Sequence, residues 1–198
     1  MSVRLNKIIA AIDAVNARDP TLVEADGKLL PKTLVYGKRM SALVKEFMPN
    51  APEVLLIAAR AQHIERWSVA RSSYPEGRIG YLNWRRDLQL HHAKLCGELM
   101  RGAGYATDDI EKVGALLRKE RLKYDPLTQT LEDVICLVFL QYEAPEFIAL
   151  HDDEKVRDIL TKTTHKMSPL GLAKAGMLTL DVRLAKLLAE ALAKRIAD

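Results

Sequence analysis

The stretch TLEDVICLVFL (residues 130–140) decides the fold class. Its first four residues resemble a capping box, in which the Thr130 hydroxyl and an acidic side chain satisfy free N–H groups at the start of a helix. The VICLVFL part is apolar on every side, which is typical of a helix that other helices surround. The stretch therefore predicts a buried helix at the centre of a helical bundle.

Helical patterns extend from this stretch in both directions. Apolar residues repeat at intervals of three and four, and proline and glycine clusters separate the repeats. The expected helices span roughly residues 5–18, 31–47, 52–71, 81–101 and 107–123, one from 130, two or three short ones, and a last at 181–196. No strand alternation is found. We expect a single compact all-α domain over 1–198, with a helical pair in 1–50, a core in 51–168 and a C-terminal helix in 169–198.

Composition limits the class of protein. Hydrophobic residues make up 48% and charged residues 28% of the chain, as in a globular protein. A net charge of +4 permits an anionic partner but is small for a protein that coats nucleic acid. Two cysteines, Cys96 and Cys136, lie in apolar helical patterns and indicate buried thiols. With no signal peptide and no membrane-spanning run in the sequence, we expect a cytoplasmic protein without a membrane partner.

The function of the chain is indicated mainly by its arginines. Six arginines and no lysine lie between Arg60 and Arg86, interleaved with histidine and aromatic residues. A guanidinium holds a carboxylate or phosphate through two parallel hydrogen bonds and stacks on aromatic rings, whereas an ammonium is a hydrated point charge. The segment AQHIERWSVARSSYPEGRIGYLNWRRDLQLHHA (residues 61–93) therefore predicts an anion-binding site.

Periodicity suggests how this segment is arranged. The expected helix 52–71 carries one polar and aromatic face: Arg60, His63, Trp67 and Arg71. Glycines in the loop 72–80 allow close backbone approach, and the next helix offers N–H groups to an anion. Lys119 is a further candidate for anion binding, although Lys119 and Glu120 also fit a solvent-exposed helix face. The expected ligand-binding residues are Arg66, Trp67, Arg71, Tyr74, Arg78, Trp84, Arg85 and Lys119.

Two histidines and one aspartate are candidates for chemistry. His63 lies between arginines, which lower its pKa and favour the neutral form of a metal ligand or base. His92 is in register with the apolar stripe of its helix and is expected to point inward, whereas His91 lies on a solvated face. Asp133 either complements the dipole of the central helix or, if Glu132 does that, contributes to a site.

Several segments together resemble the domain-of-unknown-function 4202 family. They are AQHIERW, the loop and helix start RSSYPEGRIGYLNWR, the dipeptide HA at residues 92–93, QTLEDVICLVFL and KTTHKMS. These stretches lie within about residues 31–168. The resemblance implies a helical domain without an assigned activity.

The chain also resembles, more distantly, the HD-type phosphohydrolases, helical enzymes that bind metal through a histidine, a His-Asp pair and a final aspartate. His63 is similar to their first histidine and Asp133 to their last aspartate. The chain's own His-Asp dipeptide, at residues 151–152, comes after Asp133, so His92 and Asp87 would take the middle position. The resemblance implies His63, His92 and Asp133 as ligands of a divalent metal (Mn, Fe or Zn), and Asp133 and Asp87 as catalytic residues.

Three functional hypotheses follow. The first is an HD-like, metal-dependent phosphohydrolase, in which a metal-bound water attacks a nucleotide or another phosphorylated small molecule and arginines stabilise the developing charge. The second is a non-catalytic nucleotide- or RNA-binding module. The third is a structural network in which arginines pair with internal acids. The sequence leaves open whether the protein is an enzyme, which substrate it takes and its oligomeric state.

Overall fold

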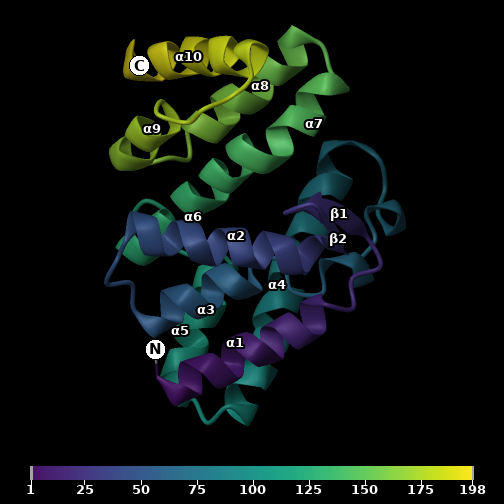
Figure 1. Ribbon diagram of the computed structural model, residues 1–198, viewed down its shortest axis with the longest axis vertical. Coiled ribbons are helices and arrows are strands. Elements are labelled where there is room, and N and C mark those ends of the chain that lie inside the picture. Colours follow the sequence, from purple (N-terminus) through teal and green to yellow (C-terminus); the bar gives the residue numbers. More distant parts are fainter. Residues whose placement is uncertain (1, 198) are drawn as a thin grey trace. The chain divides into compact units, whose positions relative to one another are not determined.

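The computed structural model describes residues 2–197, with side chains described through residue 195 (Figure 1). Helices dominate the described part, beside one short hairpin, so the predicted all-α class is confirmed. The internal contacts divide the chain into unit 1, Met1–Glu120, and unit 2, Arg121–Asp198. The single-domain organisation expected from the sequence stays a prediction.

Unit 1 is built around helix α3. Its elements are α1 (Val3–Asn16), β1 (Leu22–Ala25), β2 (Lys28–Pro31), α2 (Lys32–Phe47), α3 (Glu53–Ala61), two 3₁₀ turns (Arg66–Ser68 and Arg71–Ser73), α4 (Gly77–Gly102) and α5 (Thr107–Leu117). Helix α3 contacts α1, α2 and α5, and Leu55, Ile57 and Ala58 on it are fully buried. Gly37 allows α2 to pack close to α3, because a Cβ added there would lie 2.8 Å from the Arg60 carbonyl oxygen.

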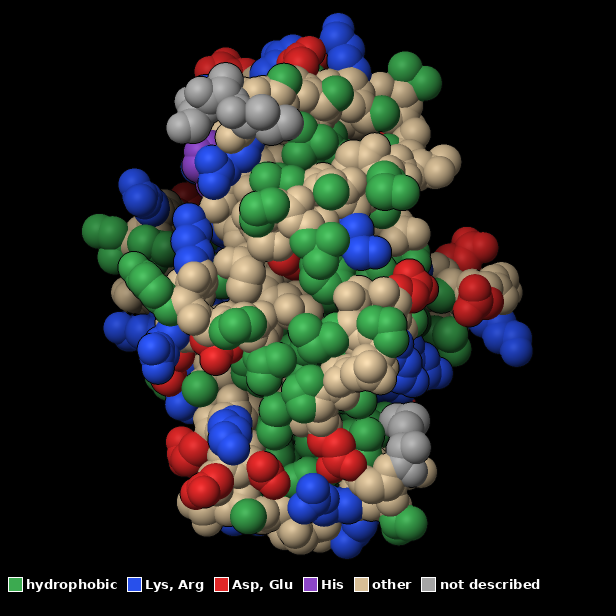
Figure 2. Space-filling view, turned by 90° about the vertical axis from the view of Figure 1, so that its left-hand side faces the viewer, with side chains coloured by type: hydrophobic (Ala, Val, Ile, Leu, Met, Phe, Trp, Pro, Cys, Tyr) green, Lys and Arg blue, Asp and Glu red, His purple; other side chains and the backbone are tan. Residues whose placement is uncertain are grey.

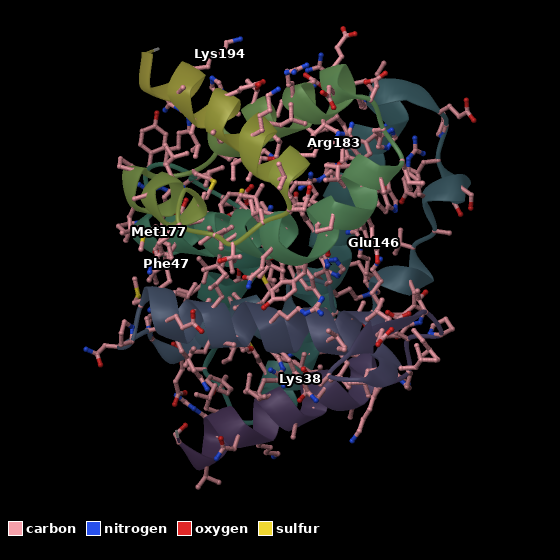
Figure 3. All side chains as sticks on the ribbon, turned by 45° about the horizontal axis from the view of Figure 1, so that its top comes forward. Lys38, Phe47, Glu146, Met177, Arg183 and Lys194 are labelled. Atoms are coloured by element: carbon pink, nitrogen blue, oxygen red, sulfur yellow. The ribbon has the colours of Figure 1, made fainter. Side chains whose placement is uncertain are left out.

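Helix α2 has a buried and an exposed side. Tyr36, Met40 and Val44 are buried, while Lys38 is exposed near the middle of the helix, which ends at Phe47 (Figure 3). Helix α2 begins at Lys32, close to the start expected from the sequence. Tyr36 therefore points into unit 1, toward the residues that follow α3.

Arg60 does not belong to the anion-binding face expected from the sequence. Its Nε and Nη2 atoms each donate to the Asp13 carboxylate at 2.6 Å, and Nη1 donates to the Ser41 hydroxyl at 3.2 Å. The bidentate pair joins α3 to α1, with only 11% of the Arg60 side chain exposed. Such an ion pair is strong and directional. Arg60 is therefore structural.

The polar loop expected before α2 contains a two-stranded hairpin. Ala25 pairs with Lys28 across the turn, and Asp26 and Gly27 both have positive φ (52° and 70°). Asp-Gly is a preferred sequence for a tight hairpin turn of this kind. Asp19 ties the hairpin to its neighbours by accepting hydrogen bonds from the Thr21 and Thr33 backbone N–H groups.

Unit 2 consists of helices alone within its described residues. They are α6 (Pro126–Val138), a π-helical segment (Phe139–Glu143), α7 (Ala144–Ala149), α8 (Asp153–Thr164), α9 (Pro169–Ala175) and α10 (Val182–Ala197). Helix α8 packs on α10, and α6 packs on α9. Leu131, Val134, Leu137 and Val138 of α6 are buried, which agrees with the apolar pattern of that stretch.

The predicted capping box at Thr130 is wrong. Helix α6 begins at Pro126, and the N-cap is Asp125, whose side chain accepts the Thr128 N–H at 2.7 Å. Proline suits the first position of a helix because its missing N–H would have no partner there. Thr130 lies inside the helix and is buried.

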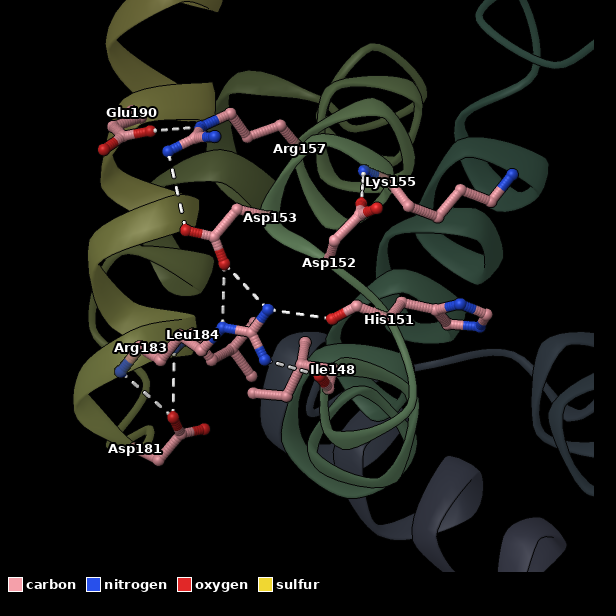
Figure 4. Close-up of polar contacts among 10 residues, drawn as sticks. All are labelled: Ile148, His151, Asp152, Asp153, Lys155, Arg157, Asp181, Arg183, Leu184 and Glu190. Carbon is pink, nitrogen blue, oxygen red and sulfur yellow. Dashed lines mark hydrogen bonds and ion pairs between the residues drawn. The ribbon is translucent and has the colours of Figure 1, made fainter.

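Arg183 ties the start of α10 to the segment between α7 and α8 (Figure 4). Its guanidinium donates to the Asp153 carboxylate at 2.8 Å, to the Ile148 carbonyl at 2.6 Å and to the His151 carbonyl at 2.8 Å. Arg157 adds a bond of 2.8 Å to Glu190. These contacts satisfy carbonyl groups left free at the end of α7.

The surface mixes apolar and charged side chains. Figure 2 shows them interspersed over one face of the molecule. Within the described residues, none of the helices has the length and apolar character that crossing a membrane requires.

Candidate anion-binding site

The helical wall predicted for residues 52–71 is not formed. Helix α3 ends at Ala61, and Glu65 takes a left-handed conformation (φ 51°), which breaks the helix before the turn Arg66–Ser68. The Glu65 N–H donates to the Asn16 side chain at 3.4 Å, a contact from α1. Trp67 and Arg71 therefore do not share a helix face with His63, and both are partly exposed on the 3₁₀ turns.

The segment 62–76 is instead held along α4 by successive contacts. The Trp84 Nε1–H donates to the Val69 carbonyl at 2.9 Å, and the Tyr74 hydroxyl donates to Asp87 at 2.9 Å. His91 Nε2 lies 3.2 Å from Glu65 Oε2. These α4 residues follow one another at intervals of three and four and so lie on one side of the helix.

This anchoring gives several predicted site residues structural contacts. Asp87, predicted as catalytic, accepts the Tyr74 hydroxyl and contacts Arg86 at 3.4 Å. Arg71 donates to the Tyr74 carbonyl at 3.0 Å. Arg78 is exposed in the first turn of α4. Their roles in ligand binding or catalysis stay predictions.

His63 is positioned by Tyr36. The two rings stack with centroids 3.8 Å apart and planes inclined by 16°. His63 follows the end of α3 and is partly exposed, whereas Tyr36 is 6% exposed. The stack covers one face of the imidazole. Tyr36 carries no signal in the sequence beyond its place on the buried side of α2.

The charges of three cations from different elements act on His63. Burial lowers the pKa of His63 well below its usual range, and the charges of Arg66, Lys119 and Arg85 act in the same direction. Arg66 comes from the first 3₁₀ turn, Arg85 from α4 and Lys119 from the residues after α5. His63 is therefore neutral near pH 7, in a field that favours an anion.

His92 points inward, as the sequence predicts. It is 2% exposed, and its ring centroid lies 6.3 Å from that of His63 and 5.9 Å from that of His91. Burial lowers the pKa of His92 to about 3, with Arg66 and His91 adding to the shift and the Ile64 backbone opposing it. Among the described residues, neither ring nitrogen has a partner in hydrogen-bond geometry. A buried polar group in this state is rare.

Lys119 has an unusual backbone. It adopts φ of 58° just after α5, while its N–H donates to the Leu116 carbonyl at 3.0 Å. Glycine is the residue that normally takes this position at a helix end, because a Cβ makes the conformation costly. A lysine here supplies a positive charge that acts on His63, which a glycine would not supply.

Asp133 is engaged within unit 2. Its carboxylate accepts the Ser168 N–H at 2.8 Å, the Ser168 hydroxyl at 2.5 Å and the Gln129 amide at 3.1 Å. Burial raises its pKa, and the bonds from Ser168 oppose this. Asp133 therefore holds the start of α9 to α6.

The geometry adds no support for the divalent metal that the HD likeness implies, and His63, His92 and Asp133 as its ligands stay a prediction. Within the described part of the chain, no group of three or more His, Cys, Asp or Glu side chains is arranged to hold a metal ion. The Asp133 oxygens are used by Ser168 and Gln129. At the His-Asp dipeptide, the His151 carbonyl accepts a hydrogen bond from Arg183, and the Asp152 side chain caps α8 by accepting the Lys155 N–H.

Comparison with known families identifies the domain but assigns no activity to it. Residues 6–188 match the model of a family described as domain of unknown function (DUF4202). The chain belongs to this family. No curated protein and no solved structure matches the chain. The match covers both units and confirms the resemblance to the DUF4202 family, while the likeness to HD-type phosphohydrolases gains no support.

Proposed function

We propose that unit 1 of this DUF4202 protein binds a phosphate-bearing small molecule at the anion site, defined as His63 with Arg66, Arg85 and Lys119. The proposal concerns binding and includes no bond cleavage. Its main support is that the charges of Arg66, Lys119 and Arg85, which come from three separate elements, all act on the imidazole that stacks on Tyr36. An ordinary surface spreads its charges, whereas convergent cations lower the free energy of a bound anion.

The contacts of the arginines favour a site over a purely structural network. Arg66 lies over the Trp84 ring, 4.6 Å from its centroid, and Arg85 donates to the Tyr81 hydroxyl at 3.3 Å. Among the described residues, neither Arg71 nor Arg85 forms an ion pair with a carboxylate.

Inorganic tripolyphosphate, titrated into the whole protein at low salt by calorimetry, tests the proposal. Arg85→Gln should weaken binding by roughly tenfold or more, because a charged hydrogen bond is lost. Lys45→Gln is the matched control, since Lys45 is exposed on α2 and lies roughly 13 Å along the helix from Tyr36.

Two results would contradict the proposal. One is the absence of tripolyphosphate binding at millimolar concentration. The other is an equal loss of affinity in Arg85→Gln and Lys45→Gln, which would indicate a diffuse charge effect. A lower melting temperature in Arg85→Gln without any bound anion would favour the structural network.

A further inference from the structure

One side of α4 carries a row of exposed apolar residues. Ile79, Leu82 and Leu90 are 77%, 52% and 51% exposed. Together with Arg86 they follow one another at intervals of three and four, so they lie on one face of the helix over roughly 16 Å. Single exposed leucines are ordinary, but apolar side chains gathered on one face and bordered by polar residues mark an interaction surface. We call these four residues the α4 stripe.

Other sides of the same helix are covered within unit 1. Leu88 and His92 point inward, each with 2% exposed. The segment 62–76 is held along a different side of α4. Helix α5 packs on α4 farther along the chain, where a Cβ added to Gly97 would lie 3.1 Å from Ile110. Within the described residues, the α4 stripe is therefore the side of this helix that stays open to a partner.

The charges along the stripe are positive. Arg86, within the stripe, has 68% of its side chain exposed, and its ion pair with the neighbouring Asp87 is long, at 3.4 Å. Arg78 and Lys94 lie just beyond the two ends of the stripe; both are exposed, and neither forms an ion pair within residues 2–197. The stripe itself contains no acid. A negatively charged partner is attracted by all three cations.

We infer that the α4 stripe docks an acidic amphipathic helix of another protein. Apolar residues of that helix, spaced by three and four, pack against the three apolar side chains of the stripe. Its flanking carboxylates lie against Arg78, Arg86 and Lys94. An apolar seam between flanking charges of opposite sign is the means by which paired helices select their partners. The inference does not depend on the anion site, because no residue of that site belongs to the stripe.

A second copy of the chain fits the stripe less well. Two stripes that face each other bring the cations of both copies into one interface, and like charges in such a contact are unfavourable. A lipid surface also fits less well. Helices that lie on a membrane bury a broad apolar face, whereas this stripe contains Arg86 and has the exposed Asn83 beside it.

Two synthetic helical peptides test the inference on the whole protein. Each has about 18 residues with leucine at intervals of three and four, and the flanking positions are glutamate in one peptide and lysine in the other. Fluorescence anisotropy of the labelled peptides measures the affinities at low salt. The glutamate peptide should bind at least about tenfold more tightly than the lysine peptide, and added salt should reduce the difference.

Substitutions in the stripe separate the apolar from the electrostatic contribution. Leu82→Asn should weaken the glutamate peptide by about tenfold through lost apolar contact. Arg86→Glu should reverse the preference between the two peptides. Val3→Asn and Lys38→Glu are the matched controls, because Val3 is 87% exposed on α1 and Lys38 is exposed on α2. Neither control should change the preference, and thermal unfolding should show that all four variants stay folded.

Each other outcome overturns the inference. Equal affinity for the two peptides, or no binding of either at millimolar concentration, removes the acidic helix as the partner. Self-association in sedimentation equilibrium that Leu82→Asn abolishes assigns the stripe to a second copy. Binding to phosphatidylserine vesicles that Leu82→Asn abolishes, without peptide binding, assigns it to a membrane surface. Tripolyphosphate affinity should be the same in Leu82→Asn and the original protein, so failure here leaves the proposed function standing.

Discussion

The imidazole of His63 lies flat on the ring of Tyr36, with centroids 3.8 Å apart. This stack connects α2 to the residues that follow α3. It orients the histidine before any ligand is present, because the covered face of the ring cannot turn toward solvent without breaking the contact. Orientation of this kind reduces the entropy that a ligand must remove on binding.

Replacing Tyr36 should destabilise unit 1 through lost packing. Tyr36→Leu removes a buried aromatic ring and should lower the free energy of unfolding by about 1–3 kcal/mol. Tyr36→Phe keeps the ring on His63 and should cost clearly less. Urea denaturation followed by circular dichroism measures both, and an equal loss in the two variants would mean that the hydroxyl rather than the stack matters.

Stability should fall in acid because the folded protein lowers the pKa of His92 and of His63. The pKa of His92 is about 3 in the folded protein, below the value of about 6.5 in an unfolded chain. Between these values the unfolded state binds more protons, so the free energy of unfolding decreases as the pH falls from 6.5. His92 alone should remove about 1.5 kcal/mol between pH 6.5 and 5, and His63 acts in the same direction.

His92→Leu provides the control for this pH dependence. Leucine leaves no ring nitrogen without a partner, so the variant should stay folded and lose part of the acid sensitivity. The measurement is the slope of unfolding free energy against pH between 5 and 6.5. A slope equal to that of the original protein would show that His92 does not titrate in this way.

Lys119 should affect stability and binding in opposite directions. Lys119→Gly relieves the left-handed backbone and should raise stability by about 1 kcal/mol, while tripolyphosphate affinity decreases because a cation is lost. Lys123→Gly is a matched control, since Lys123 also has positive φ (76°). It should gain stability without losing affinity. If both variants lost affinity, the loss would not depend on the position of Lys119, and the prediction would be wrong.

Glu53 should contribute to stability without contributing to binding. Its carboxylate accepts hydrogen bonds from Ser2, from Arg4 at 3.2 Å and from Tyr105 at 2.9 Å, and these bonds, Ser2 first, lower its pKa. Glu53→Gln should reduce the free energy of unfolding by about 1–2 kcal/mol. The exposed Glu46 on α2 offers the control substitution. Thermal unfolding checks the first effect, and unchanged tripolyphosphate affinity checks the second.

Gly171 and Asp133 should be coupled in unit 2. A Cβ added to Gly171 would lie 2.6 Å from Asp133 Oδ1, so Gly171→Ala should destabilise by about 1–3 kcal/mol. Asp133→Ala also destabilises, because Ser168 loses its acceptor. The double variant should lose less than the sum, since the overlap disappears with the carboxylate. Additive losses would contradict the close contact.

The sequence predicts most of the helices because their apolar residues repeat without interruption. The inward position of His92 is confirmed since α4 is regular around it. The start of α6 could also have been found, because Asp125 followed by Pro126 is a standard helix beginning. The residues from Thr130 to Asp133 also resemble a helix start, although they lie inside α6.

The end of α3 could not be found in this way. The residues from Gln62 to Ala70 contain neither glycine nor proline. Helix formation stops there because Glu65 is held by Asn16 of α1 and His91 of α4, contacts between residues distant in sequence. The predicted arginine face failed for this reason, and the partnership of His63 with Tyr36 depends on the same tertiary arrangement.

The contacts of segment 62–76 with α4 also have a kinetic consequence. Trp84, Asp87 and His91 hold the segment at three successive levels of one rigid helix. A segment anchored at such short intervals cannot swing as a hinged flap. Ligand entry should therefore need only side-chain rearrangement, and association should proceed in a single fast phase rather than wait for a slow closing step.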